Sequence, residues 1–113
     1  MDKTYELIFC IVNAGFSGTV MDAARSAGAT GGTLLRGRGS AGKEAEDFFH
    51  IQIEQEKEIV MILAPAEIKD AIMTSVYKEA GLASAGQGII FSLPVTRTAG
   101  LSQVHEKPKK DKD

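Results

Sequence analysis

The segment Tyr5-Glu-Leu-Ile-Phe-Cys-Ile-Val12 is β-branched, aromatic and almost continuously apolar. Such a run is typical of a central strand with both faces covered. Alternate side chains give each face three apolar groups: Leu7, Phe9 and Ile11 on one, and Ile8, Cys10 and Val12 on the other. Helices on one side of a sheet can cover only one of these sets. An exposed apolar surface of this kind usually indicates assembly, so we expect other copies of the chain to cover the second face.

Helical and strand patterns alternate after this strand. Ser17 can cap a helix whose apolar residues recur at helical spacing until Gly28, where a C-terminal glycine belongs. A short, glycine-weakened strand is predicted at residues 31–36. After a long loop, the alternation over residues 49–53 predicts a half-exposed strand.

The C-terminal half continues this order. Residues 55–58 are predicted to form a polar turn or a strand end, and Ile59-Val-Met-Ile-Leu63 a second central strand. Pro65 can occupy the first position of a helix that Gly81 closes. Residues 89–95 are predicted to be the last strand, in which Pro94 marks an end or an edge.

This order of elements predicts a ferredoxin-like βαββαβ sandwich of the α+β class, with two helices on one face of an antiparallel sheet. We assign it to residues 1–100 as a single domain. Residues 101–113 are too polar to bury a face and are expected to form a disordered tail.

The composition is that of an ordinary globular protein. With 43% apolar and 25% charged residues, the 113-residue chain can build one core but not two. The formal net charge of −2 and the lack of Trp disfavour nucleic-acid binding. We find neither a signal-peptide pattern nor a membrane-spanning run, and expect a cytoplasmic protein without membrane insertion. Cys10, the single cysteine, lies in an apolar run and is expected to be a buried thiol.

The segment Thr30-Gly-Gly-Thr-Leu-Leu-Arg-Gly-Arg-Gly-Ser-Ala-Gly-Lys43 combines glycines with basic side chains. Bare backbone beside positive charge is the combination that anion-binding loops use, and a solvated surface hairpin is the plain alternative. The spacing from Gly37 to Lys43 also satisfies a phosphate-binding P-loop. Glu44 stands where a Ser or Thr should hold magnesium, which argues against a P-loop.

Catalytic and metal chemistry have little support in the sequence. His50 and His105 are the only histidines, and neither has neighbours at metal-ligand spacing. No nucleophile and base can be paired, so we expect no enzyme. A second glycine segment, Gly86-Gln87-Gly88, precedes the last strand. In the expected fold the two glycine segments lie towards opposite edges of the sheet, so they could enclose a nucleotide only across a subunit boundary.

From about Tyr5 to Val95 the chain resembles the nitrogen regulatory P-II family. The resemblance rests on four features: Gly28-Ala-Thr-Gly-Gly-Thr33, Arg36-Gly-Arg-Gly39, Pro65 before the second helix, and Gly86-Gln-Gly-Ile-Ile-Phe91. The last is similar to the family's glycine-aspartate-glycine-lysine-isoleucine-phenylalanine signature. The order and spacing of the four together are more specific than any one of them.

The resemblance implies a homotrimer that binds adenine nucleotides (ATP, ADP or AMP) in clefts between subunits and regulates a transporter or an enzyme. The nucleotide-binding positions would be Gly31, Thr33, Gly37, Arg38, Gly39, Leu63, Gly86, Gln87 and Gly88, the last three from the neighbouring subunit. Residues 40–49 would form the T-loop, the arm that contacts the partner, through Ser40, Lys43, Glu44 and Phe48. Nucleotide binding would order or release this arm.

Several positions depart from the family pattern. The lysine of the glycine signature falls on Ile89, and the late pair of arginines is reduced to Arg97, so positive charge for a triphosphate is thin. Ser40 replaces a family arginine, and Ala41 replaces the glutamine that helps to hold magnesium and 2-oxoglutarate. The T-loop is short and has no tyrosine for uridylylation. These departures leave magnesium and 2-oxoglutarate without support and favour a less charged effector such as ADP or AMP.

Two other functions stay open. A metal-binding trimer of the copper-tolerance type shares this architecture, but the chain offers it only Cys10, the two histidines and the methionines. A small nucleotide-hydrolysing enzyme would use Arg38 and Lys43 on the phosphates.

Overall fold

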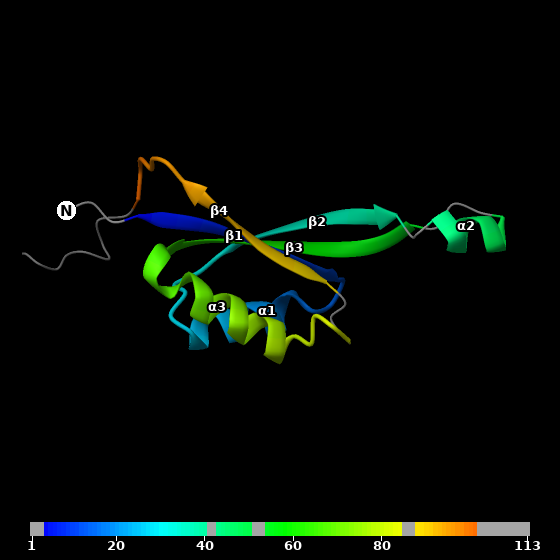
Figure 1. Cartoon of the computed structure of the whole chain (residues 1–113), viewed down its shortest axis with the longest axis horizontal. Coiled ribbons are helices and arrows are strands. Elements are labelled where there is room, and N and C mark those ends of the chain that lie inside the picture. The colour runs from blue at the N-terminus through cyan, green and yellow to red at the C-terminus, as the bar shows by residue number, and fades with distance from the viewer. Residues whose placement is uncertain (1–3, 41–42, 51–53, 85–87, 102–113) are drawn as a thin grey trace, which may run out of the picture.

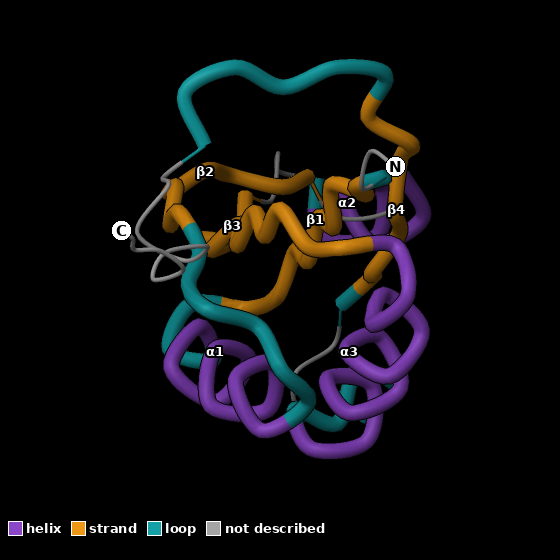
Figure 2. The backbone as a smooth tube through the Cα atoms, turned by 90° about the vertical axis from the view of Figure 1, so that its left-hand side faces the viewer, coloured by secondary structure: helices purple, strands orange, loops and turns teal. Residues whose placement is uncertain are grey.

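The computed structural model describes residues 4–40, 43–50, 54–84 and 88–101. Its elements are β1 (Tyr5–Asn13), α1 (Ser17–Ser26), β2 (Thr33–Ser40), α2 (Lys43–Phe49), β3 (Glu54–Pro65), α3 (Ala66–Glu79) and β4 (Ile89–Val95). The strands form one antiparallel sheet in the order β2-β3-β1-β4, and α1 and α3 pack together on one of its faces (Figure 1 and Figure 2). The predicted ferredoxin-like α+β fold is confirmed, with β1 central and β4 on an edge. None of the helices in the described ranges combines the length and apolar composition needed to cross a membrane.

The core lies between the sheet and the two packed helices. It is built from β1 and β3 on the sheet side and from α1 and α3 on the helix side: Ile8, Cys10, Val12, Val60, Ile62, Ala64, Val20, Ala23, Ala24, Ile72 and Val76. Burial of each larger aliphatic side chain stabilises the fold by about 1.5–3 kcal/mol. The small alanines of α1 let this helix approach the sheet and α3 closely.

The opposite face of the sheet, which we call the outer face, is apolar and is not covered by any helix of the described chain (Figure 2). Cross-strand pairing aligns one side-chain set of β1 with apolar residues of the other strands. The outer face consists of Leu7, Phe9, Ile11, Leu35, Ile59, Met61, Leu63, Ile89, Phe91 and Leu93. All ten side chains keep part of their surface exposed, up to 57% at Ile89. The single chain therefore leaves uncovered the second apolar face expected from the alternation in β1.

Beyond α1 and α3, β2 and β3 continue as a two-stranded arm that ends in α2 (Figure 1). The predicted strand at residues 31–36 was therefore too short, because β2 runs to Ser40. Residues 55–58 belong to β3 and pair with β2. Basic side chains on one strand face acidic ones on the other, and such pairs support a sheet that has no core beneath it. Of the predicted T-loop, residues 40–49, Ser40 ends β2 and residues 43–49 form α2, while residues 41–42 lie outside the described residues.

The strand predicted at residues 49–53 is wrong at its start. Phe49 is the last residue of α2, and residues 51–53 lie outside the described residues. Five alternating residues are a short signal, and local helical contacts outweigh it. One of these contacts is the i,i+4 ion pair between Lys43 Nζ and Asp47 Oδ1, which are 3.6 Å apart.

Two helix starts also differ from the predictions. Ser17 is the first helical residue of α1, and the cap position before it has no side-chain hydrogen bond. Glu58 of β3 takes the role of the cap, because its Oε1 accepts a hydrogen bond from the Ser17 N–H at 3.0 Å. Pro65 precedes α3 with an extended ψ of 141° and is not its first residue. Gly28 and Gly81 follow the helix ends with positive φ of 113° and 61°, as predicted.

Candidate functional site

Charged side chains face one another across β2 and β3 where the arm leaves the rest of the sheet, a region that we call the root of the arm. The register places Arg36 opposite Glu58 and Arg38 opposite Glu56. Arg38 Nη1 also donates a hydrogen bond to Glu54 Oε1, at 3.1 Å. Because these two side chains are 71% and 50% exposed, their ion pair contributes only about 0.2–1 kcal/mol. Arg38 can therefore exchange Glu54 for another anion at low cost.

A shallow groove of about 240 Å³, which we call the basic groove, lies beside these pairs. It is lined by Ala14, Arg36, Gly37, Arg38, Glu56 and Lys57. Arg36 and Arg38 flank Gly37 and lie on the helix-covered face with Glu56, whereas Lys57 lies opposite Gly37 on the outer face. Small-molecule sites usually measure about 300–1,000 Å³. The groove of one chain is therefore too small to enclose a nucleotide by itself.

Contacts between β3 and the end of β1 hold the wall of the basic groove. Lys57 Nζ donates a hydrogen bond to Asn13 Oδ1 at 2.8 Å. The Ala14 N–H donates to the Glu56 carbonyl oxygen at 3.1 Å. Because these contacts join β3 to the last residue of β1 and to the residue after it, the groove is anchored to the body of the protein as well as to the arm.

Glu58 is a buried carboxylate beside the basic groove, with 7% of its surface exposed. Hydrogen bonds from the Ser17 hydroxyl and the Ser17 N–H hold the pKa of Glu58 below its ordinary value. The Gly15 backbone and the Arg36 charge add to this effect, and burial opposes it. Glu58 is therefore negatively charged at neutral pH, so it counts in the charge of the groove.

Gly37, Arg38 and Gly39 form part of β2, whereas the glycine spacing had predicted a loop. Gly37 and Arg38 line the basic groove, and Gly39 follows them opposite Gln55. A P-loop must curl around a phosphate, and a paired strand cannot do this. The P-loop spacing is therefore a coincidence of composition.

Gly31, Thr33 and Leu63 lie away from the basic groove. Gly31 precedes β2, and Thr33 opens that strand as an exposed residue. Thr33 is four strand residues, or about 13 Å, from Gly37. Leu63 lies on the outer face. Within one chain, the structure does not join these three predicted adenine-side residues to the groove.

Gly88 lies next to β4, on the sheet edge opposite to β2. A Cβ at this position would overlap the carbonyl oxygen of Ile11 and would lie 2.9 Å from Val12 Cγ1. Close packing therefore requires this glycine independently of any ligand. Gly86 and Gln87 lie outside the described residues. In the strand order, β3 and β1 separate Gly88 beside β4 from Gly37 and Gly39 on β2, in agreement with the prediction that the two glycine segments lie at opposite edges.

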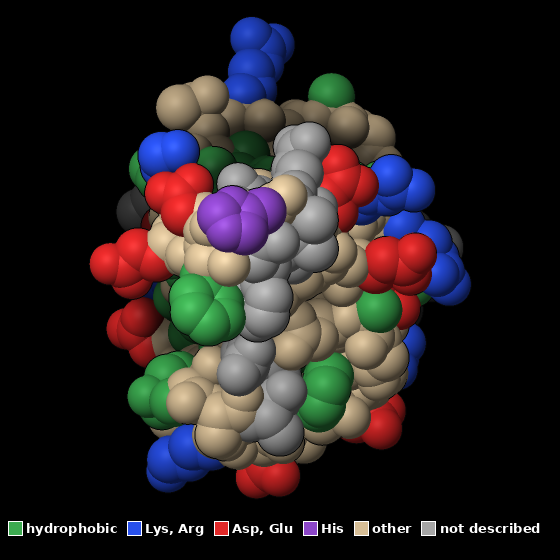
Figure 3. Space-filling model, turned by 90° about the vertical axis from the view of Figure 1, so that its right-hand side faces the viewer, with side chains coloured by type: hydrophobic (Ala, Val, Ile, Leu, Met, Phe, Trp, Pro, Cys, Tyr) green, Lys and Arg blue, Asp and Glu red, His purple; other side chains and the backbone are tan. Residues whose placement is uncertain are grey.

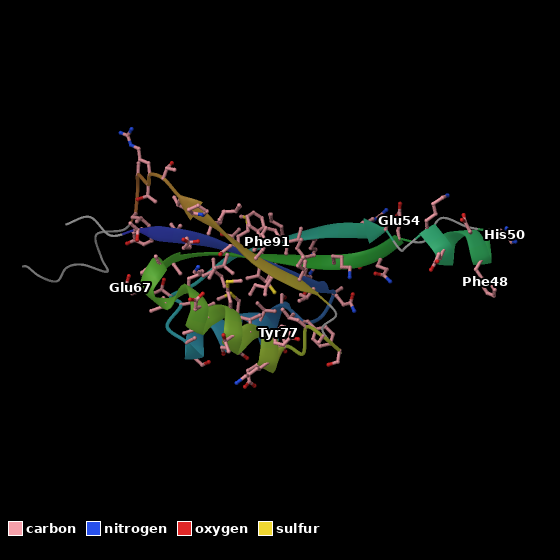
Figure 4. All side chains as sticks on the ribbon, viewed as in Figure 1. Phe48, His50, Glu54, Glu67, Tyr77 and Phe91 are labelled. Atoms are coloured by element: carbon pink, nitrogen blue, oxygen red, sulfur yellow. The ribbon has the colours of Figure 1, made fainter. Side chains whose placement is uncertain are left out.

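The predicted partner-binding residues lie along the outer half of the arm. Ser40 ends β2, and Lys43 and Glu44 begin α2 as exposed residues. Phe48 is 77% exposed and projects from the end of the arm (Figure 4). Figure 3 views the molecule from this end and shows acidic and basic side chains interspersed around it. The structure thus brings these four residues to one extremity of the molecule.

Four charged residues at the root of the arm were not among the predicted site residues. They are Arg36 and Lys57, Glu56 beside them, and Glu54, which pairs with Arg38. A spacing of two residues could have found Arg36, Glu54 and Glu56, with arginines at 36 and 38 and carboxylates at every second residue of 54–58. The signal was missed because the first strand was predicted to end at Arg36 and residues 55–58 were interpreted as a polar turn or a strand end.

The metal-binding alternative gains no donor set from the structure. Across the residues described, no group of three or more His, Cys, Asp or Glu side chains is placed to hold a metal ion. Cys10 is fully buried, and burial raises the pKa of its thiol to about 11. A protonated, buried thiol is a poor metal ligand, because metals bind the thiolate.

Solved structures show the same fold. The chain is similar to the GlnK–ATP complex of B. subtilis, with a TM-score of 0.68 and 14% identity over 85% of each chain. It is similar to a DUF3240 family protein from Shewanella baltica OS155, with a TM-score of 0.65 and 16% identity over 90% of this chain and 100% of that chain. It is also similar to Arabidopsis thaliana PII bound to citrate, with a TM-score of 0.60 and 21% identity over 83% of this chain and 77% of that chain. At these identities the similarity concerns the fold alone.

Comparison of the sequence with curated proteins gives no match. The profile of the family described as nitrogen regulatory protein P-II matches residues 5–105, which include all seven helices and strands described above. The sequence match and the fold agree: this chain belongs to the nitrogen regulatory P-II family.

Proposed function

We propose that the protein is a P-II-type signalling protein that binds an adenine nucleotide between the subunits of a homotrimer and regulates a partner protein through its arm. The observation that carries this proposal is the basic groove at the root of the arm, where Arg36 and Arg38 flank Gly37 on the same face of the sheet. Guanidinium groups suit phosphate oxygens, and a glycine lets a ligand approach the backbone. The proposal contains no catalytic step and assigns the protein to the cytoplasm.

Two of the similar solved structures hold small anions. The GlnK protein of B. subtilis is a complex with ATP, and the PII protein of Arabidopsis thaliana is bound to citrate. Both ligands carry several negative charges, so a basic groove is the feature of this chain to compare with them. The proposal that the ligand is a nucleotide rests on these ligands and on the family. The groove of this chain supports it with guanidinium groups that can bind phosphate oxygens.

The outer face supports the trimer. Its ten apolar side chains extend over all four strands, and their partial exposure in one chain favours association. In a closed ring every subunit can turn the same face towards the centre. Ring contacts are heterologous, so the β2 edge of one subunit meets a different surface, such as the β4 edge, of the next. Gly88 and the residues before it would then close the basic groove of a neighbour.

The position of the groove supports the signalling role of the arm. Gly37 and Arg38 line the groove and belong to the strand that leads out to Ser40 and α2. A ligand that binds Arg38 competes with Glu54, which pairs with it across the arm. Nucleotide binding would therefore favour one arrangement of the arm over another, as a shift in population requires.

The test compares Arg38→Ala with Arg25→Ala, which removes an exposed arginine of α1 outside the groove. Calorimetry with AMP, ADP and ATP should show binding to the wild type and to Arg25→Ala. Arg38→Ala should weaken it about tenfold or more, because a hydrogen bond to a charged group contributes about 1.5–3 kcal/mol. Equal binding by all three proteins would remove the groove from the proposal, and no binding by the wild type would refute the nucleotide part.

A further inference from the structure

The charges of the basic groove balance. Arg36, Arg38 and Lys57 supply three positive charges, and Glu54, Glu56 and Glu58 supply three negative ones. The two arginines and the three glutamates lie on the helix-covered face, whereas Lys57 lies on the outer face beside Asn13. The formal sum at the root of the arm is therefore zero. A site that binds three or four negative charges usually presents an excess of positive ones. The groove lacks this excess.

Each basic side chain of the groove already has a partner. Arg38 Nη1 lies 3.1 Å from Glu54 Oε1, and Lys57 Nζ lies 2.8 Å from Asn13 Oδ1. Arg36 lies opposite the buried Glu58 and close enough to stabilise its charge. Of these pairs only Arg38–Glu54 joins two side chains that are each at least half exposed. Arg38 is therefore the group that an incoming phosphate can take over.

We infer that the groove selects its effector by charge, preferring an adenosine nucleotide with a single phosphate to one with two or three, and that Glu54 is the residue that sets this preference. The inference rests on the proposed nucleotide-binding function and names its ligand class. A phosphate monoester carries about −1.5 to −2 charges at pH 7. One such group can replace the Glu54 carboxylate on Arg38 and adds at most about one negative charge.

Additional phosphates would lie in a field that Glu54 and Glu56 make unfavourable. The displaced Glu54 carboxylate stays attached to β3 beside the groove, and Glu56 lines it. Glu54 Oε1 lies 3.1 Å from Arg38 Nη1, and Glu56 lies directly opposite Arg38 in the register. Both carboxylates are therefore within the Debye length of about 8–10 Å of a phosphate on Arg38, so their repulsion is only partly screened. The repulsion grows with each phosphate that the ligand carries, whereas Arg38 can bind only one of these phosphates. The affinity order should therefore be AMP above ADP above ATP.

The experiment measures the dissociation constants of adenosine, AMP, ADP and ATP by calorimetry, without magnesium, for wild type, Glu54→Gln and Glu79→Gln. Glu79 is exposed at the end of α3, away from the groove, and provides the same change of charge. Wild type and Glu79→Gln should bind AMP about tenfold more tightly than ATP. Glu54→Gln should raise the affinity for AMP about threefold and the affinity for ATP about tenfold or more, because the gain scales with the charge of the ligand. The affinity for adenosine, which carries no phosphate, should be the same in all three proteins.

The outcomes separate the two proposals. Selection by charge would be overturned if the wild type bound ATP more tightly than AMP, or if Glu54→Gln changed the affinities for AMP and ATP equally. Either result would leave the proposed nucleotide-binding function standing. No binding of any phosphorylated ligand, to the wild type or to Glu54→Gln, would overturn both. A difference in affinity between AMP and ATP that shrinks as salt is raised from about 50 to about 500 mM would support the electrostatic origin of the preference.

Discussion

The rings of Phe9 and Phe91 stack across β1 and β4, with their centroids 5.3 Å apart and their planes within 5° of parallel. The two residues are directly opposite in the register and lie on the outer face. Such a pair contributes about 0.5–1.5 kcal/mol beyond the burial of its area. Phe91 nevertheless keeps 37% of its surface exposed. The outer face is thus ordered within one chain without being covered, which is what a subunit interface requires.

Phe91→Asp should therefore dissociate the proposed trimer. A carboxylate on the outer face would lose its water if three sheets met there, at a cost of several kcal/mol. The matched control is Tyr77→Asp, because Tyr77 is 52% exposed on α3, on the helix-covered side of the sheet (Figure 4). Light scattering should give the mass of a trimer for wild type and for Tyr77→Asp, and that of a monomer for Phe91→Asp. A monomeric wild type, or an intact Phe91→Asp trimer, would contradict the interface.

Glu58→Gln should destabilise the fold without touching its apolar core. The Glu58 carboxylate accepts the hydrogen bond of the Ser17 N–H at the start of α1, and charged acceptors of this kind contribute about 1.5–3 kcal/mol. Urea unfolding at pH 7 should show a loss of about 1–3 kcal/mol in the free energy of unfolding. Glu79→Gln, an exposed change at the end of α3, should leave it unchanged.

The same carboxylate gives a pH dependence with a defined sign. The pKa of Glu58 is lower in the folded protein than its ordinary value of 4.5. The unfolded chain therefore takes up the proton first, and the stability that the charged form supplies is present above pH 4.5 and lost as the pH falls below it. The difference in stability between wild type and Glu58→Gln should shrink over this acidic range. A difference that stays constant down to pH 3 would contradict the assigned role.

The parts of the fold that follow from local pattern could be predicted from the sequence. The alternation in Tyr5–Val12 sets both faces of β1, and the helix ends follow from single glycines such as Gly28. The length of β2 could not be predicted, because Gly37 and Gly39 lower strand propensity while pairing with β3 overrides it. Tertiary contacts of this kind leave no local signal.

The site was predictable to a smaller extent for the same reason. Arg38 was found from its neighbouring glycines, but its partner Glu54 is 16 residues away and its place on the facing strand depends on the register. The contact between Glu58 and Ser17 spans 41 residues. The balance of charge at the root of the arm therefore became visible only when the two strands were aligned.

The structure separates two glycines to which the family resemblance gives one role. Gly88→Ala should destabilise the fold by about 1–3 kcal/mol or more, because the added methyl group would meet the backbone of Ile11. Gly31→Ala should change stability by less than about 0.5 kcal/mol, because no atom lies within 4 Å of the added methyl group. Thermal unfolding of the two variants measures this difference. Equal losses would contradict the packing described for Gly88.

Cys10 should resist thiol reagents while the protein is folded. Its side chain is fully buried, and its thiol pKa of about 11 leaves little thiolate at pH 8. Reaction with a chromogenic disulfide at pH 8 should be slow in buffer and fast in guanidinium chloride. Because reaction requires opening of the core, the slow rate should rise in Glu58→Gln in step with its loss of stability. Rapid reaction of the native wild type would contradict the position of Cys10 between sheet and helices.

The role of the arm in signalling can be tested by hydrogen exchange. The backbone amides of residues 38–40 and 54–56 belong to a two-stranded segment without a core, so they should exchange by local opening. A nucleotide that contacts Arg38 at the root of this segment should slow their exchange about tenfold or more when it is present at a hundred times its dissociation constant. At short labelling times the amides of β1 stay protected in both states and serve as the internal reference.

Arg38→Ala should abolish the response of the arm amides to nucleotide, and Arg25→Ala should retain it. If calorimetry shows that nucleotide binds while the arm amides exchange at an unchanged rate, the effector site is uncoupled from the arm, and regulation must leave the protein through another surface.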